Sequence, residues 1–149
     1  MKPVFAGHEE NAMFLNPYLF FDGDCEAAFA FYAQTLRGEI EMLSRYGDAP
    51  GGDGNPAIAD RVIHVCLKFG EQRLMGSDAC PPQHPYTRAE GFFVCVNVDS
   101  VAEAKRIFGA FAEGGQVQVP LDKTFFSEAW GMLVDRFGIP WMVNCAKEG

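Results

Sequence analysis

Hydrophobic and polar residues alternate along several short segments of the chain, while two other segments carry apolar residues at helical spacing. Alternation with a period of two is typical of strands, because successive side chains point to opposite faces of a sheet. It predicts strands at residues 14–21, 39–46, 61–69, 72–77, 91–98 and 116–119, followed by a two-stranded hairpin at 124–145. Apolar residues three and four positions apart predict helices over 25–37 and from Ser100 to about Glu113. Asp24 is the predicted N-cap of the first helix, and Ser100 with Glu103 is the predicted capping box of the second. The buried stripe predicted for the first helix is Ala27, Ala28, Phe31, Tyr32, Thr35 and Leu36.

The segment Thr124–Cys145 holds both tryptophans and joins two apolar arms through a turn at Asp135–Gly138, which predicts the hairpin. Alternation places Trp130 on one face of the first arm, and it places Trp141 and Asn144 on opposite faces of the second arm. Aromatic side chains at such positions either fill a core or form the flat wall of a ligand pocket.

The order of predicted elements repeats at an offset of roughly 75 residues, with a strand, a helix and three strands in each half. The halves are residues 14–78 and 91–146, and a proline-rich link joins them into one domain. The predicted fold class is α+β, with two βαβββ modules whose curled mixed sheets form a cleft and carry helices on their outer faces. Residues 1–13 are predicted to be a loose leader, and the Gly/Pro/Asp-rich segment 47–60 a mobile loop.

Composition and charge narrow the classes of partner. The 149 residues are 48% hydrophobic and 21% charged, which predicts a packed globule of one domain or two small halves sharing a core. The net charge of −8 and the lack of a basic cluster argue against nucleic acid or an anionic membrane as partner. No apolar run is long enough to span a bilayer. Five scattered cysteines without a CxxC motif predict buried free thiols and a cytoplasmic location.

Several stretches together resemble one known family. They are Pro17–Tyr32, Ile63–Val65, Leu74–Asp78, Asp99–Gly115 and Trp130–Asn144. In this order and spacing they resemble the PhnB-like branch of the vicinal-oxygen-chelate superfamily, whose relatives include glyoxalase I, bleomycin-resistance proteins and extradiol dioxygenases. The resemblance implies paired βαβββ modules and a homodimer with clefts at the subunit boundary. The branch is also associated with ubiquinone-precursor methylation, but the chain has no glycine-rich nucleotide-binding turn to hold a methyl donor.

The resemblance also implies a divalent metal held by about four His or Glu ligands on the inner strands. It places these ligand positions near Pro17, Val94 and Met142 and on Leu74–Gly76. None of these side chains suits a hard or borderline metal ion. No cofactor is therefore predicted, and a divalent metal stays open only through a non-standard set of His64, Glu128 and Asp78.

Two residues are predicted to be catalytic. His64 lies on the Val62–Lys68 strand face that lines the cleft if the alternate residues pack under a helix. It is either a core or rim histidine or a general base, since histidine changes charge near neutral pH. Glu128 either shares the cleft from the other half or is a solvated carboxylate at a strand end.

Five residues are predicted to bind the ligand, and each has a structural alternative in core packing or hairpin capping. They are Tyr18, Phe126, Trp130, Trp141 and Asn144. His8 and His84 lie in loop-like contexts and receive no role. Asp78, Asp99 and Asp135 are best explained as turn and cap residues.

Three functions follow from these residues. The leading hypothesis is a protein that binds a small, partly aromatic molecule in its cleft without the usual metal set. The second is a lyase or isomerase that uses His64, with or without the non-standard metal set. The third is a sequestering protein similar to the bleomycin-resistance relatives. Each of them predicts a homodimer with a small-molecule ligand, and the sequence leaves open whether the protein is an enzyme.

Overall fold

The computed structural model describes residues 13–48, 56–82 and 84–147, and it forms two compact units that meet between Tyr86 and Thr87. The predicted leader, except Met13, and half of the predicted 47–60 loop (residues 49–55) lie outside the described residues. No helix among the described residues has the length and hydropathy needed to cross a membrane.

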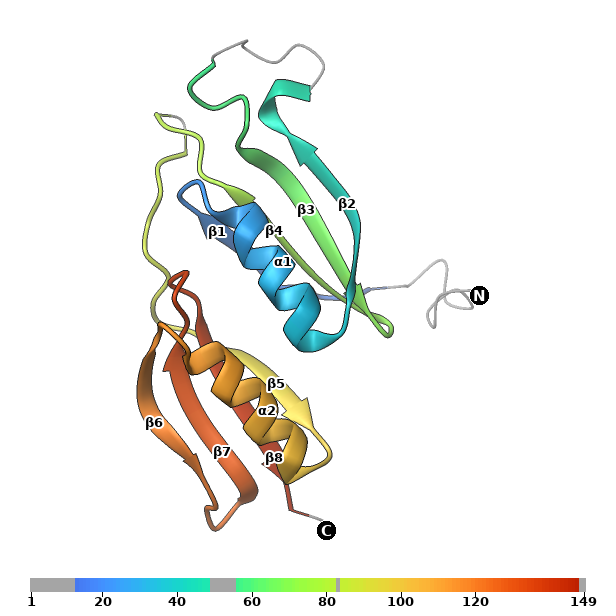
Figure 1. Cartoon of the computed structure of the whole chain (residues 1–149), viewed down its shortest axis with the longest axis vertical. Coiled ribbons are helices and arrows are strands. Elements are labelled where there is room, and N and C mark those ends of the chain that lie inside the picture. The colour runs from blue at the N-terminus through green and yellow to red at the C-terminus, as the bar shows by residue number, and fades with distance from the viewer. Residues whose placement is uncertain (1–12, 49–55, 83, 148–149) are drawn as a thin grey trace. The chain divides into compact units, whose positions relative to one another are not determined.

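Unit 1 contains one helix and a four-stranded mixed sheet (Figure 1). Its elements are β1 (Tyr18–Phe21), α1 (Cys25–Leu36), β2 (Glu39–Arg45), a short 3-10 helix (Tyr46–Asp48), β3 (Val62–Phe69) and β4 (Gln72–Asp78). The strand order is β1-β4-β3-β2, with β1 parallel to β4 and the other neighbours antiparallel.

Unit 2 repeats this topology. Its elements are β5 (Val94–Val98), α2 (Val101–Ala112), β6 (Gln116–Asp122), β7 (Ser127–Val134) and β8 (Pro140–Ala146). The strand order β5-β8-β7-β6 matches that of unit 1 element for element, again with a single parallel pair, β5 with β8. The predicted α+β class with two βαβββ modules is confirmed.

In unit 1 the core lies between α1 and one face of the sheet, because the alternating apolar residues of the strands meet the apolar stripe of the helix. Phe21 packs edge-on against Phe29 with ring centroids 5.9 Å apart, and both side chains are fully buried. Gly76 lets Phe29 approach, since an added Cβ would lie 2.7 Å from its ring. Phe29 was not part of the predicted helix stripe, whereas the predicted Ala27 is exposed.

In unit 2 the core lies between α2 and one face of its sheet. Phe111 of α2 stacks on Trp141 of β8, with ring centroids 4.4 Å apart. Gly131 gives Phe108 the room that Gly76 gives Phe29, because a Cβ there would lie 2.7 Å from the Phe108 ring. The predicted capping box at the start of α2 is present, with the Ser100 hydroxyl accepting from the Glu103 N–H at 3.1 Å.

A buried aspartate fixes a connection in each unit. Asp78 accepts hydrogen bonds from the backbone N–H groups of Gly23, Cys25 and Val62 at 2.8–3.0 Å. It thereby takes over the capping predicted for Asp24, which occupies the N-cap position of α1 without a side-chain hydrogen bond. A buried carboxylate is stable only with such partners, so Asp78 holds the β1–α1 turn to the start of β3.

Each sheet therefore has a face covered by its helix and an opposite face, which we call the helix-free face. Register assigns side chains to it. In unit 1, Tyr18 pairs with Met75 and Phe20 with Ser77, while Leu19 and Phe21 between them are buried toward α1. The residues that the core does not use are gathered on the helix-free faces, and the candidate site is built there.

Candidate functional site

Tyr18 and His64 form a hydrogen-bonded pair on the helix-free face of unit 1. The Tyr18 Oη lies 2.9 Å from His64 Nδ1, and the two rings stack with centroids 5.6 Å apart at 27°. The pair spans β1 and β3, which flank β4 on either side. Both residues were singled out as candidate site residues, and the structure brings them together.

The hydrogen bond determines which atoms of the pair face a ligand. When the Tyr18 hydroxyl donates to Nδ1, the imidazole carries its proton on Nε2 and presents that N–H as a donor. Burial raises the pKa of Tyr18, the hydrogen bond of Ser77 acts in the opposite direction, and nearby Cys25 adds to the rise. The Tyr18 hydroxyl therefore stays neutral across the physiological range, and it donates to Nδ1 or accepts from it according to the tautomer of His64.

An aromatic row extends the pair along the same face. Phe20 lies 5.2 Å from Tyr18 between ring centroids and stacks on His84 at 4.5 Å. Two backbone hydrogen bonds of 2.7 and 2.8 Å with Cys80 hold His84 in place. Tyr18 and Phe20 each keep 38% of their surface exposed. Sequence reasoning assigned no role to His84, because only the tertiary contact with Phe20 places it here.

A charged cluster occupies the other end of this face. Glu41 Oε1 accepts from Arg73 Nε at 2.7 Å and from the Cys66 thiol at 3.3 Å. The hydrogen bond from Arg73 is the main cause that lowers the pKa of Glu41, and burial is the main cause that raises the pKa of Cys66. Cys66 is therefore a protonated donor that orients Glu41, not an activated thiolate.

On the helix-free face of unit 2, aromatic rings come from the strand that corresponds to β3. Trp130 of β7 contacts Phe126 edge-on, with ring centroids 5.6 Å apart. Phe126 is 49% exposed and is flanked by Phe125, which is more exposed still. The predicted ligand residues Phe126 and Trp130 thus lie together on a face where the core does not need them.

Asn144 belongs to a chain of polar side chains on the same face. The Ser127 hydroxyl donates to Asn144 Oδ1, and Asn144 Nδ2 donates to Asn97 Oδ1 at 3.0 Å. Asn97 also accepts a weak hydrogen bond from the Cys95 thiol at 3.9 Å. Both ends of the Asn144 amide are engaged by neighbours, so its orientation is fixed by the protein itself.

Glu128, the second predicted catalytic residue, lies in unit 2, whereas His64 lies in unit 1. The Glu128 carboxylate is 3.8 Å from the Lys123 ammonium, and both side chains are exposed. An exposed pair at this distance contributes little to stability. The joint catalytic role of His64 and Glu128 stays a prediction.

Trp141 requires a correction, because it does not lie on the helix-free face. It is 1% exposed, stacks on Phe111 and donates its indole N–H to Asp135 Oδ2 at 2.8 Å. Asp135 Oδ1 accepts from the N–H groups of Phe137 and Ile139, so this carboxylate links the hairpin turn to the core. Trp141 is a core residue and not part of a ligand wall.

The metal site that the superfamily implies does not fit the residues present. Within residues 13–48, 56–82 and 84–147, no three His, Cys, Asp or Glu side chains are grouped to hold an ion. Both carboxylate oxygens of Asp78, a member of the non-standard set, accept hydrogen bonds from backbone N–H groups, three in all. His64 Nδ1 is engaged by Tyr18.

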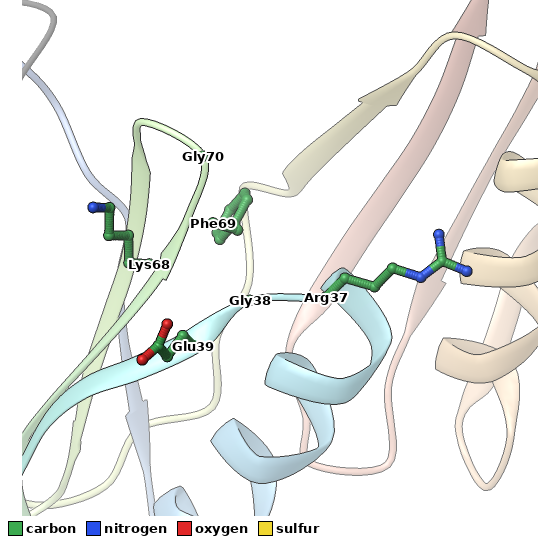
Figure 2. A pocket seen from close by; sticks show the side chains of 6 residues that line it. All are labelled: Arg37, Gly38, Glu39, Lys68, Phe69 and Gly70. Atoms are coloured by element: carbon green, nitrogen blue, oxygen red, sulfur yellow. The ribbon is translucent and has the colours of Figure 1, made fainter. Parts of the chain in front are cut away.

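A hollow of about 320 Å³ lies at the end of unit 1 where α1 leads into β2 and β3 turns into β4. It is lined by Arg37, Gly38, Glu39, Lys68, Phe69 and Gly70. Figure 2 shows that the Arg37 side chain extends away from Glu39 and Lys68, so these charged groups do not converge on one point. The hollow therefore lacks the convergent polar groups of a ligand site.

Comparison with known proteins adds the family. A family profile described as 3-demethylubiquinone-9 3-methyltransferase matches residues 14–144, which is most of the chain. The chain belongs to this family. Protein YjdN of Escherichia coli K12 is 31% identical over 143 residues, covering 90% of this chain and 96% of YjdN.

Solved structures agree with this assignment. Protein PA1353 from Pseudomonas aeruginosa is 43% identical, with a TM-score of 0.85 over 92% of this chain and 100% of its own. A PhnB protein from Bacillus cereus, titled a putative 3-demethylubiquinone-9 3-methyltransferase, is 27% identical with a TM-score of 0.73, covering 90% of this chain and 100% of its own. A glyoxalase/bleomycin resistance protein/dioxygenase family enzyme from Burkholderia phytofirmans shares the fold at 16% identity, with a TM-score of 0.61 over 89% of this chain and 97% of its own. The predicted PhnB-like relationship is confirmed.

The family description implies a methyl donor, and the strand–helix turns of this PhnB-like chain do not fit one. At the β1–α1 turn the N–H groups of Gly23 and Cys25 already donate to Asp78. At the β5–α2 turn the Ser100 hydroxyl caps the helix by accepting from Glu103. A nucleotide-type ligand binds to backbone N–H groups at such turns, and here these groups already donate to side chains of the protein.

Proposed function

We propose that this PhnB-like protein binds a small, partly aromatic molecule against the helix-free faces of its sheets, without the metal set of the superfamily. The observation that carries the proposal is the row Phe20, Tyr18 and His64, whose rings contact one another outside the core, with Tyr18 and Phe20 each 38% exposed. Flat rings beside fixed polar groups suit a planar ligand.

Native mass spectrometry of the freshly purified protein, with a parallel metal analysis, tests this function. The expected result is an organic mass that leaves on denaturation, or saturable binding of an aromatic probe that weakens in Phe20→Ala and Trp130→Ala. The matched control is Phe31→Ala, which removes a half-buried ring of α1 on the helix side. One metal ion per chain held at the helix-free faces would contradict the proposal.

The Tyr18–His64 hydrogen bond favours a second candidate, acid–base catalysis on the same ligand. For His64 to act as the general base, its Nδ1 carries the proton and donates to the Tyr18 oxygen, which leaves the Nε2 lone pair for the ligand, and Tyr18 holds this tautomer. Glu128 stays the second predicted catalytic residue. His64→Gln keeps a hydrogen-bonding side chain but removes the titration. Lost turnover with retained binding supports catalysis, and binding without any product in the wild type supports sequestration.

We further propose a homodimer in the cytoplasm. The strand β6 is an edge of its sheet and exposes Val117 and Val119, and an exposed apolar edge of this kind is a surface on which a partner can pair. The five cysteines are unpaired, which suits a reducing compartment. Sedimentation at micromolar concentration is expected to give twice the chain mass of 16.4 kDa, and a clean monomer would overturn the dimer.

A further inference from the structure

The helix-free face of unit 2 carries one row of side chains that crosses three neighbouring strands. Asn97 of β5 pairs in register with Asn144 of β8, and Asn144 pairs with Trp130 of β7. Neighbouring strands lie about 4.8 Å apart, so the two outer members of the row, Asn97 and Trp130, are separated by about 10 Å. That span is the length of a two-ring aromatic molecule with a short substituent.

Hydrogen bonds in this row fix the orientation of both amides. Ser127 donates to Asn144 Oδ1, which turns Asn144 Nδ2 toward Asn97, where it donates to Oδ1 at 3.0 Å. The Cys95 thiol reaches the same Oδ1 at 3.9 Å. Because the oxygen of Asn97 is occupied, its Nδ2 group is left with two N–H donors and no partner among the described residues.

We infer that Asn97 is the ligand-contacting amide of this face and that Asn144 is a positioning residue that orients it. The ligand is a planar aromatic molecule with a carbonyl or carboxylate oxygen. Its ring contacts Trp130 and its oxygen accepts from Asn97 Nδ2. This inference rests on the proposed binding function and adds the polar group that the ligand must carry. Cys95 and Asn97 alternate with Val96 in the sequence, so their shared face was readable there, although no role was predicted for either.

A pair of probes matched in shape tests the inference on the full chain: 2-acetylnaphthalene has an oxygen acceptor, and 2-ethylnaphthalene lacks it. Titrations are followed in ¹H–¹⁵N spectra, where the Asn97 side-chain NH₂ pair is assigned by its loss in Asn97→Asp. The wild type is expected to bind the acetyl probe about three- to tenfold more tightly, the usual net value of one hydrogen bond. Only the acetyl probe is expected to shift the Asn97 NH₂ pair.

Asn97→Asp is nearly isosteric and keeps an oxygen that accepts from Asn144, but it presents no donor to the ligand. It is expected to bind both probes equally, at the affinity the wild type has for 2-ethylnaphthalene. Gln34→Glu, on the exposed side of α1, adds the same negative charge elsewhere and is expected to keep the preference. Ser127→Ala, which frees Asn144, is expected to reduce the preference without changing the affinity for 2-ethylnaphthalene.

The outcomes distinguish the role of Asn97 from the proposed binding function. Equal binding of both probes by the wild type, or an undiminished preference in Asn97→Asp, overturns the role of Asn97 and leaves the binding function standing. Failure of the wild type to bind either probe, with no shift at the Trp130 indole N–H, counts against the binding function itself. A preference lost in Asn97→Asp and kept in Gln34→Glu supports the inference.

Discussion

Replacement of Asp135 tests whether the hairpin is held from inside the core, as the hydrogen bonds indicate. The carboxylate is buried and accepts from Phe137 N at 2.8 Å, Ile139 N at 3.0 Å and Trp141 Nε1 at 2.8 Å. Asp135→Ala leaves these three donors without their acceptor. Each buried donor left unsatisfied costs about 1–3 kcal/mol, and water partly serves the half-buried Phe137 N–H, so the free energy of unfolding is expected to fall by about 3–5 kcal/mol.

Asp135→Asn tests the hydrogen bond from the Trp141 indole apart from the two hydrogen bonds from the Phe137 and Ile139 backbone. The retained oxygen serves Phe137 and Ile139, while the new NH₂ group faces the Trp141 N–H, donor against donor. The expected loss is about 2 kcal/mol. In a Trp141→Phe background the opposing donor is gone, so the same substitution should cost about 1–2 kcal/mol less, a coupling that a double-mutant cycle measures.

The assay is urea denaturation followed by far-UV circular dichroism and by tryptophan emission. Both tryptophans lie in unit 2, so emission reports on that unit and dichroism on both units. For Asp135→Ala the midpoint is expected to fall by about 1.5–2.5 M urea. Asp22→Ala is the control, because its carboxylate is 59% exposed and its ion pair with Arg61 contributes less than about 1 kcal/mol. Equal losses in the two alanine variants would refute the reasoning.

Three further predictions concern packing, ionisation and thiol access. Gly76→Ala places a Cβ 2.7 Å from the Phe29 ring and is expected to lower the free energy of unfolding by about 2–4 kcal/mol. Gly109→Ala, on the open side of α2, is expected to raise it by about 0.5–1 kcal/mol. Thermal melts of the two variants measure both changes. Because the pKa of Tyr18 is raised in the native state, the folded protein keeps this proton to a higher pH than the unfolded chain does. The contribution of the neutral Tyr18 hydroxyl to the free energy of unfolding is therefore complete below about pH 10 and is lost as the pH rises through the native pKa. The absorbance difference at the tyrosinate band between the wild type and Tyr18→Phe should therefore have its midpoint above pH 10.0, the ordinary pKa of tyrosine, and a midpoint below it would contradict the assignment. A thiol reagent at neutral pH should modify the exposed Cys95 before the fully buried Cys25, which mass spectrometry of peptides would show, and faster labelling of Cys25 would contradict the packing of α1.

The fold was predictable because alternation and helical spacing are local signals that act on every element. The strand faces were also predictable, since Trp141 and Asn144 were placed on opposite sides of β8, as the register shows. Alternation alone does not say which of two apolar faces lies under the helix. Trp141 and Trp130 therefore looked equivalent in sequence, and only the stacking of Phe111 on Trp141 separates them.

The polar part of the site was less predictable, because it depends on contacts between residues far apart in sequence. The Tyr18–His64 bond joins residues 46 positions apart, and the Asn144–Asn97 bond joins residues 47 positions apart. His84 belongs to the aromatic row only because its ring stacks on Phe20. No local pattern marks such partners, and the sequence could offer only the residue types and the face of each strand.

The two units share their strand order, and they differ in the residues on their helix-free faces. A helix phenylalanine over a strand glycine and a buried aspartate at the end of a strand occur in both units, but on strands that do not correspond: Gly76 and Asp78 lie in β4, whereas Gly131 lies in β7 and Asp135 directly follows it. At matching positions beside the parallel pair, unit 1 has Phe20 and Ser77 where unit 2 has Asn97 and Asn144. Asn97 is exposed, so core packing does not require it. The proposed contact of Asn97 with the ligand predicts that Asn97→Phe abolishes the preference for an oxygen acceptor while leaving the free energy of unfolding unchanged within about 0.5 kcal/mol.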